Sequence, residues 1–348
     1  MTTRASSRRS WARLADFGIL AALLLSAGFG VPAAEKPDES PYRGKILLFG
    51  AVSATNKEIK AANVQAIRPD GSGLETVCAF EGAQVSRGRV SPDGRSLAVE
   101  VVAKDGGRSV WVVGPSGDRR KLADMDRVVA WSPDGKSLAC YRGAEEGFDS
   151  VALDVATGRE RRLPLPKHDV VEGWTPDGSR LVVVAGNRDL MVDTPRGLYP
   201  QRQLYVCKSD GSERRLLTPE EKFDQLSARY SPDGKHVAHW RRENPDKDRV
   251  LHSGVVRHAD GTGAREFVQF DKLIASLDKG HRGKPDAPCW SPDGKQILWV
   301  VWHSRRVASG SDSIEYYDLV FTSPERGYER RVPLYEKGIV SVANVDWR

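Results

Sequence analysis

The chain has 348 residues, of which 39% are apolar and 29% are charged, a balance that suits one large soluble domain. Its formal net charge is +6 at pH 7, and it falls to +3 without residues 1–34, because four Arg and one Asp lie there. Such modest basicity argues against nucleic acid as a partner.

The first 34 residues have the layout of a secretory signal peptide. Four arginines precede an apolar run from Ile19 to Val31, and small residues follow at Ala33 and Ala34. We therefore predict a signal peptide over 1–34, a linker over 35–44 and a periplasmic or secreted mature protein. The alternative is an uncleaved membrane anchor, although the apolar run is short beside the roughly 20 residues of a membrane span. The pair Arg8-Arg9 leaves the export route open between the general and the twin-arginine pathways.

Short strands follow in groups along the rest of the chain. The first group has three expected strands, at 45–49, 63–67 and 74–78. Four-strand groups are expected over 87–122, 127–163, 170–217, 226–267 and 286–333, with a short helix at 270–277 where apolar residues recur at helical spacing. The four cysteines fall in or beside strands of different groups, which favours free buried thiols over disulfides. They are Cys78, Cys140, Cys207 and Cys289.

A Ser/Thr-Pro-Asp-Gly turn recurs within these groups, at 91–94, 132–135, 175–178, 231–234 and 291–294. A period near 40 to 60 residues with strand-like content indicates a β-propeller. Pro and Gly supply the backbone angles of a tight turn, and the hydroxyl and carboxylate bond to its amides. We therefore expect the aspartates to hold the turns rather than bind metal. The aromatic residue that precedes most copies is expected to pack between blades.

The C-terminal residues can supply the fourth strand that the first group lacks. Residues 340–347 resemble one more inner strand, with Trp347 placed where Trp131 and Trp290 stand before their turns. We predict an all-β, six-bladed propeller of four-stranded blades, spanning 45–348 and closed by pairing of the last strand into the first blade. The connections at 185–202, 241–249, 269–287 and 303–313 are long and share one face, where we expect loops that bind a partner.

The aromatic-Ser-Pro-Asp-Gly turn, with a later Asp-Gly-Ser turn, resembles the repeat of TolB-like (PD40 or WD40-like) propellers over residues 42–348. The resemblance implies a six-bladed propeller, often periplasmic and often a protein-binding platform. Residues 35–44 are too few for the separate α/β domain that precedes the propeller in TolB. Similar repeats occur in propellers of serine peptidases and in sugar-acid lyases, so the fold leaves function open.

We predict a non-enzymatic platform that binds a protein or peptide in the cell envelope as a monomer, with no cofactor and no nucleic acid. Inner-strand starts place a mixed-charge ring at the channel mouth, flanked by basic loop residues. The ring is Arg127, Asp169, Gln225 and Asp286, and the flanking residues are Lys167, Arg282, Arg305 and Arg306.

The alternative is a metal-assisted lyase or hydrolase acting on an acidic carbohydrate. His168, His281 and His303 fall in long-face connections, and two or three converging imidazoles could bind a metal. His281 and His303 could approach each other, whereas His168 lies across the ring. We do not expect a peptidase, because the sequence contains no Gly-x-Ser-x-Gly motif and no recognisable hydrolase domain.

Overall fold

The computed structural model describes residues 40–55, 58–59, 62–145, 147–194, 197–219, 224–246, 249–277, 282–306 and 313–348. Ser40–Arg348 form the second of two units of the chain, and every element below belongs to it. The predicted signal peptide lies outside the described residues and remains a prediction. Among the described residues, no helix has the length and apolarity that crossing a membrane requires.

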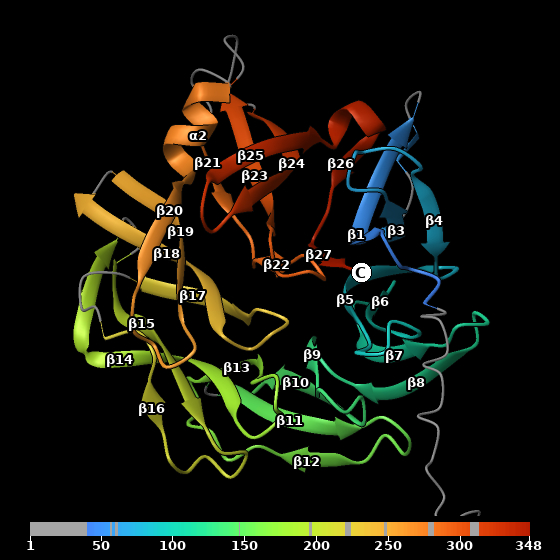
Figure 1. Ribbon diagram of the computed structural model, residues 1–348. Helices are drawn as coiled ribbons and strands as arrows, with labels where there is room; N and C mark the ends of the chain where they lie inside the picture. The colour runs from blue at the N-terminus through green and yellow to red at the C-terminus, as the bar shows by residue number, and fades with distance from the viewer. Residues whose placement is uncertain are drawn as a thin grey trace, which may run out of the picture. The chain divides into compact units, whose positions relative to one another are not determined.

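Six antiparallel sheets surround a common centre in the second unit (Figure 1). The predicted fold, an all-β propeller of six four-stranded blades, is confirmed. Blade 1 contains β1 (Ile46–Thr55), β2 (Glu58–Ile59), β3 (Asn63–Ile67), β4 (Glu75–Cys78), β26 (Ile339–Ser341) and β27 (Asn344–Trp347). Blade 2 contains β5 (Ala83–Val90), β6 (Leu97–Ala103), β7 (Arg108–Val113) and β8 (Arg119–Asp124). Blade 3 contains β9 (Arg127–Trp131), β10 (Ser137–Gly143), β11 (Phe148–Asp154) and β12 (Glu160–Arg162).

In the other three blades the strands also follow one another in chain order from the centre of the ring outward. Blade 4 contains β13 (Val170–Trp174), β14 (Leu181–Thr194), β15 (Gly197–Cys207) and β16 (Arg215–Leu216). Blade 5 contains β17 (Asp224–Tyr230), β18 (His236–Asp246), β19 (Arg249–His258) and β20 (Arg265–Gln269), followed by helix α2 (Phe270–Leu277). Blade 6 contains β21 (Arg282–Pro285), β22 (Cys289–Trp290), β23 (Ile297–Arg306), β24 (Ser313–Ser323) and β25 (Gly327–Pro333), and the 3-10 helix Tyr335–Lys337 precedes β26.

The recurring turns form by one set of hydrogen bonds. In blade 3, Ser132 Oγ donates to Asp134 Oδ1 at 2.6 Å and accepts from the amide of Ser137 at 2.9 Å. The amide of Gly135 donates to Ser132 O at 2.9 Å, with Gly135 at a φ of 70° that suits glycine. The same bonds occur in the other four copies. Hydrogen bonds from Ser132 Oγ and the Lys136 amide hold the pKa of Asp134 below its usual value, so the aspartates hold the turns as predicted.

The aromatic residues before the turns join neighbouring blades. Trp131 Nε1 donates to Arg89 O at 3.1 Å, and Trp290 Nε1 donates to Arg229 O at 3.0 Å, in each case reaching the preceding blade. Their rings pack in or against the apolar clusters between sheets. The core is therefore divided into layers between blades, and the predicted packing role is confirmed.

The last strand joins the two ends of the ring. β27 pairs with β1, with Trp347 opposite Ile46. The Asn344 side chain also donates to Gly88 O at 2.9 Å and accepts from the Gly88 amide at 3.2 Å, so the same strand binds blade 2. A side chain at Gly88 would place its Cβ 2.3 Å from the Phe49 ring, which explains the glycine at this close approach.

Residues 40–44, which the sequence assigned to a linker, form turns against blade 2. Tyr42 is buried in an apolar cluster, and Ser40 Oγ donates to Gly94 O at 2.6 Å. The cysteines are free in the structure: Cys78, Cys140 and Cys207 are buried, and Cys289 is half-buried.

Three of the four predicted long loops are instead extended hairpins, so this part of the prediction was wrong. β14 and β15 stay paired out to Thr194 and Gly197, β18 and β19 out to Asp246 and Arg249, and β23 and β24 out to Arg306 and Ser313. The fourth connection contains α2 at the predicted residues and β21. Pairing satisfies the backbone amides and carbonyls of these polar segments, which a loop would leave to water.

Candidate functional site

Four charged residues near the inner strands form a cluster that we call the mouth. They are Arg87 of β5, Arg127 at the start of β9, Asp286, which follows β21, and Glu100 of β6. Arg87 Nη1 lies 3.7 Å from Asp286 Oδ2, with 27% and 35% of the two side chains exposed. The Arg127 guanidinium lies over the Tyr141 ring, 5.6 Å from its centroid. Two of the predicted ring residues, Arg127 and Asp286, are thus placed here, together with Arg87, which sequence reasoning missed.

Glu100 lies beneath the arginines of the mouth. It is fully buried in β6, and its Oε1 accepts from Arg108 Nη1, whereas its Oε2 has no partner among the described residues. Burial raises the pKa of Glu100. The hydrogen bond from Ser86 and the charges of Arg127, Arg108 and Arg87 lower it, but they do not cancel the effect of burial. A buried acidic side chain thus attracts the arginines of the mouth and is hydrogen-bonded to Arg108. A charged residue inside the apolar strand 97–103 was the signal that could have revealed it.

The other two predicted ring residues are buried. Asp169 is 4% exposed and its carboxylate is paired with Arg214, which stacks on Tyr205 with 4.2 Å between its Cζ and the ring centroid. Gln225 is 1% exposed, and its Oε1 has no partner among the described residues. Neither side chain is presented to a partner at the surface.

The flanking basic residues divide between two blades. Lys167 and its neighbour His168 are exposed before blade 4, where Lys167 O accepts from the amide of Phe148 at 2.7 Å. Arg282, Arg305 and Arg306 lie in blade 6, where Arg282 is opposite Ser304, so the backbone gathers them at one end of that sheet. The side chains of these three arginines lie outside the described part of the chain.

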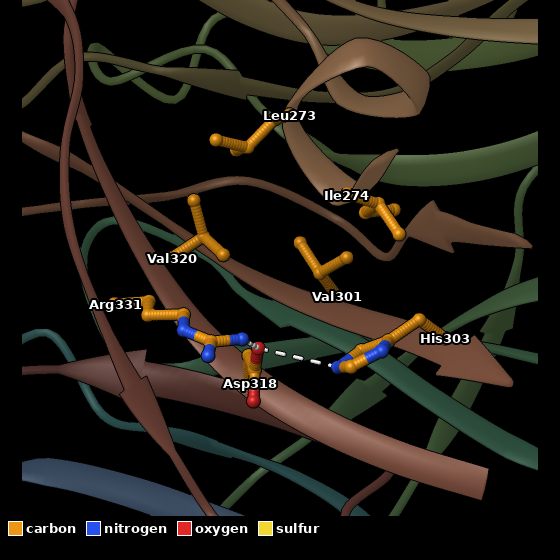
Figure 2. A pocket seen from close by; sticks show the side chains of 7 residues that line it. All are labelled: Leu273, Ile274, Val301, His303, Asp318, Val320 and Arg331. Atoms are coloured by element: carbon orange, nitrogen blue, oxygen red, sulfur yellow. Dashed lines mark hydrogen bonds and ion pairs between the residues drawn. The ribbon is translucent and has the colours of Figure 1, made fainter. Parts of the chain in front are cut away.

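His303 is in strand β23, not in a loop, and lines a small pocket under α2 (Figure 2). Its Nε2 is 3.2 Å from Asp318 Oδ2, which also accepts from Arg331 Nη1 at 3.1 Å. His303 and Asp318 are 3% and 2% exposed, and Leu273, Ile274, Val301 and Val320 complete the lining. His303, Asp318 and Arg331 thus form a hydrogen-bonded polar network at one side of this otherwise apolar pocket in blade 6.

The histidines predicted as metal candidates do not converge where the structure describes them. His168 is exposed beside blade 3, His303 is buried in blade 6, and His281 lies outside the described residues. Within the described ranges there is no group of three or more His, Cys, Asp or Glu side chains that could hold a metal ion.

Comparison with known proteins supports the fold. No protein-family model matches the chain. An uncharacterized protein of Agrobacterium fabrum is 24% identical over 271 residues, which cover 76% of this chain and 84% of that protein. Among solved structures, TolB from Acinetobacter baumannii has a TM-score of 0.62 at 16% identity, over 88% of this chain and 67% of that chain. A structure assigned as TolB from Agrobacterium tumefaciens has a TM-score of 0.50 at 18% identity, over 65% of this chain and 89% of that chain. The chain therefore has the fold of the TolB-like six-bladed propellers.

Proposed function

We propose that the protein is exported and that its propeller binds a protein or peptide partner in the cell envelope through the mouth, without catalysing a reaction. The arginines and the apolar run before residue 34 support export. The TolB-like fold supports a binding role. The observation that carries the proposal is the mouth, where exposed charges are positioned by a buried one.

The charged side chains of the mouth can give up their contacts with one another and form contacts with a bound protein or peptide instead. The Arg87–Asp286 pair is partly exposed and its closest atoms are 3.7 Å apart, so it contributes little to stability and can open at low cost. Glu100 attracts the guanidinium groups of Arg87, Arg108 and Arg127, and it accepts a hydrogen bond from Arg108. Preorganised donors lose less conformational entropy when a ligand binds.

The lengths of the hairpins around the mouth also support binding there. In blade 2, β6 and β7 turn at 103–107, where Ala103 still pairs with Ala83 at the start of β5. In blade 4, β14 and β15 continue to Thr194 and Gly197, well past the start of β13, where Val170 pairs with Val184. Arg87 and Arg127 thus lie on the side of the ring with short connections. A polar segment that enters from this side meets charged side chains first and the longer hairpins beyond them.

The test replaces Arg127 and Asp286 together by Ala in the full chain. We expect loss of the partner captured from an envelope extract, with an unchanged melting temperature, because both residues are only half-buried and the Arg87–Asp286 pair contributes little to stability. Arg161→Ala is the matched control, since Arg161 is an exposed arginine of the outer strand β12. Equal capture by the double variant and the control would contradict the proposal.

Export, the domain boundaries and the monomeric state are part of the same proposal. N-terminal sequencing of the mature protein should begin at Glu35 if the signal is cleaved after Ala34. An N-terminus at residue 1 in a membrane fraction would support the uncleaved anchor. Sedimentation velocity of the mature chain should give a single species with the mass of a monomer.

A further inference from the structure

Two arginines occupy equivalent places in opposite blades, near the turn end of the inner strands. The residue two positions before each turn hydroxyl is Arg89 in blade 2 and Arg229 in blade 5. The equivalent residues of the other blades are small, neutral or acidic. They are Ala130, Gly173, Cys289 and, before Trp347, Asp346.

The guanidinium groups reach toward two neighbouring inner strands. Arg89 Nε donates to Val129 O of β9 at 2.9 Å, and Arg229 Nη1 donates to Glu172 O of β13 at 3.0 Å. β9 and β13 approach closely here, since a Cβ on Gly173 would lie 3.4 Å from the Cβ of Ala130. The two guanidinium groups thus lie beside adjacent inner strands of blades 3 and 4, whose equivalent residues, Ala130 and Gly173, carry no charge.

Positive charge is in excess around these two side chains. Glu172 Oε2 is 3.2 Å from Arg229 Nη1, and Asp346 Oδ2 accepts from the Val90 amide and lies 3.8 Å from Arg348 Nη2. Within the described residues, the hydrogen bonds of Arg89 go to backbone carbonyl oxygens. Burial, followed by the charge of Arg229, lowers the pKa of Arg89 to about 10, and Asp346 opposes that shift. The carboxylates of Glu172 and Asp346 thus neutralise only part of the positive charge of the guanidinium groups of Arg89, Arg229 and Arg348.

We propose that the centre of the ring binds a carboxylate group between Arg89 and Arg229. The carboxylate belongs to a small free acid or to an acidic residue of a peptide, and both present the same planar acceptor to a guanidinium fork. Both arginines are half-buried. The site is at the turn end of the inner strands, and it does not depend on partner binding at the mouth.

The test titrates the full chain with trifluoroacetate at constant ionic strength and follows the fluorine NMR line width. We expect saturable binding that weakens about tenfold in Arg89→Gln and in Arg229→Gln, because each removes one charged fork. Arg161→Gln, on the exposed face of β12, should bind as the unaltered chain does. Unsaturable broadening, or equal affinity in all four proteins, would overturn the site.

Asp346→Asn keeps the test decisive if an arginine variant does not fold. The amide oxygen can still accept from the Val90 amide, while a competing negative charge is removed. Affinity for trifluoroacetate should then rise roughly threefold, and a fall or no change would count against the site.

Competition distinguishes the two sources of the carboxylate. Displacement of trifluoroacetate by acetyl-Gly-Asp-Gly-amide, but not by the matching Asn peptide, would support a peptide-borne carboxylate. Displacement by acetate alone would support a free acid. If neither acetate nor the Asp peptide displaces the probe, the site does not recognise carboxylates and the proposal fails.

Discussion

Replacing Trp347 by Ala should cost more stability than any other single truncation in the last strand, because this side chain joins the two ends of the ring. Trp347 is 8% exposed, lies opposite Ile46 in the pairing of β27 with β1, and contacts Phe321 of blade 6 edge-to-face with 5.4 Å between ring centroids. One apolar cluster contains residues of both blades around it. Its removal leaves a void that the two sheets share.

The expected loss is about 3–5 kcal/mol, the range for truncating a buried Trp, and it includes about 1 kcal/mol for the aromatic pair. Urea unfolding followed by far-UV circular dichroism measures it, with an unchanged slope if the ring still closes. Tyr328→Ala is the control, since Tyr328 is 39% exposed on β25, and it should cost below about 1 kcal/mol. A loss below about 1 kcal/mol for Trp347→Ala would refute the packing described for the closure.

Three further changes test other parts of the structure. Glu100→Gln should flatten the pH dependence of stability. Burial raises the pKa of Glu100 in the folded protein above its usual 4.5. The protonated side chain therefore stabilises the fold below pH 4.5, and this stabilisation is lost as the pH rises through the folded-state pKa. Urea midpoints at several pH values check this. If the midpoint of the variant falls with rising pH as steeply as that of the unaltered chain, the result would count against it. Arg257→Ala should cost about 3 kcal/mol in urea unfolding, because buried Arg257 donates to His239 Nε2 at 3.0 Å and to Leu217 O at 2.9 Å; a near-neutral effect would contradict this network. Gly88→Ala should cost about 1–3 kcal/mol in the same assay through its clash with Phe49, and tolerance of Ala there would contradict the contact between blades 1 and 2.

The turns made most of the fold predictable. Each Ser/Thr-Pro-Asp-Gly copy marks the end of an inner strand and the start of the next, so the four-strand group predicted over 127–163 is observed as β9 to β12, from Arg127 to Arg162. The helix at 270–277 is observed at the predicted residues. The extended hairpins were not predictable in this way, because segments such as 186–194 lack the alternation of apolar and polar residues that marks a half-buried strand.

The candidate site was predictable only in part, because a residue's place along a strand does not determine which way its side chain points. Inner strands β13 and β17 contain register shifts, between Val171 and Gly173 and between Leu226 and Arg229. Such bulges turn side chains away from simple alternation. Arg87 follows a similar shift in β5, which helps to explain why it was missed.

Photo-crosslinking in cells tests the central claim, that a partner binds at the mouth, most directly. A benzoylphenylalanine placed at position 127, and separately at position 286, should give an adduct of the same mass, identifiable by mass spectrometry. Position 161, on the exposed outer strand of blade 3, should give no such adduct. Adducts of equal yield from all three positions, or from position 161 alone, would contradict binding at the mouth.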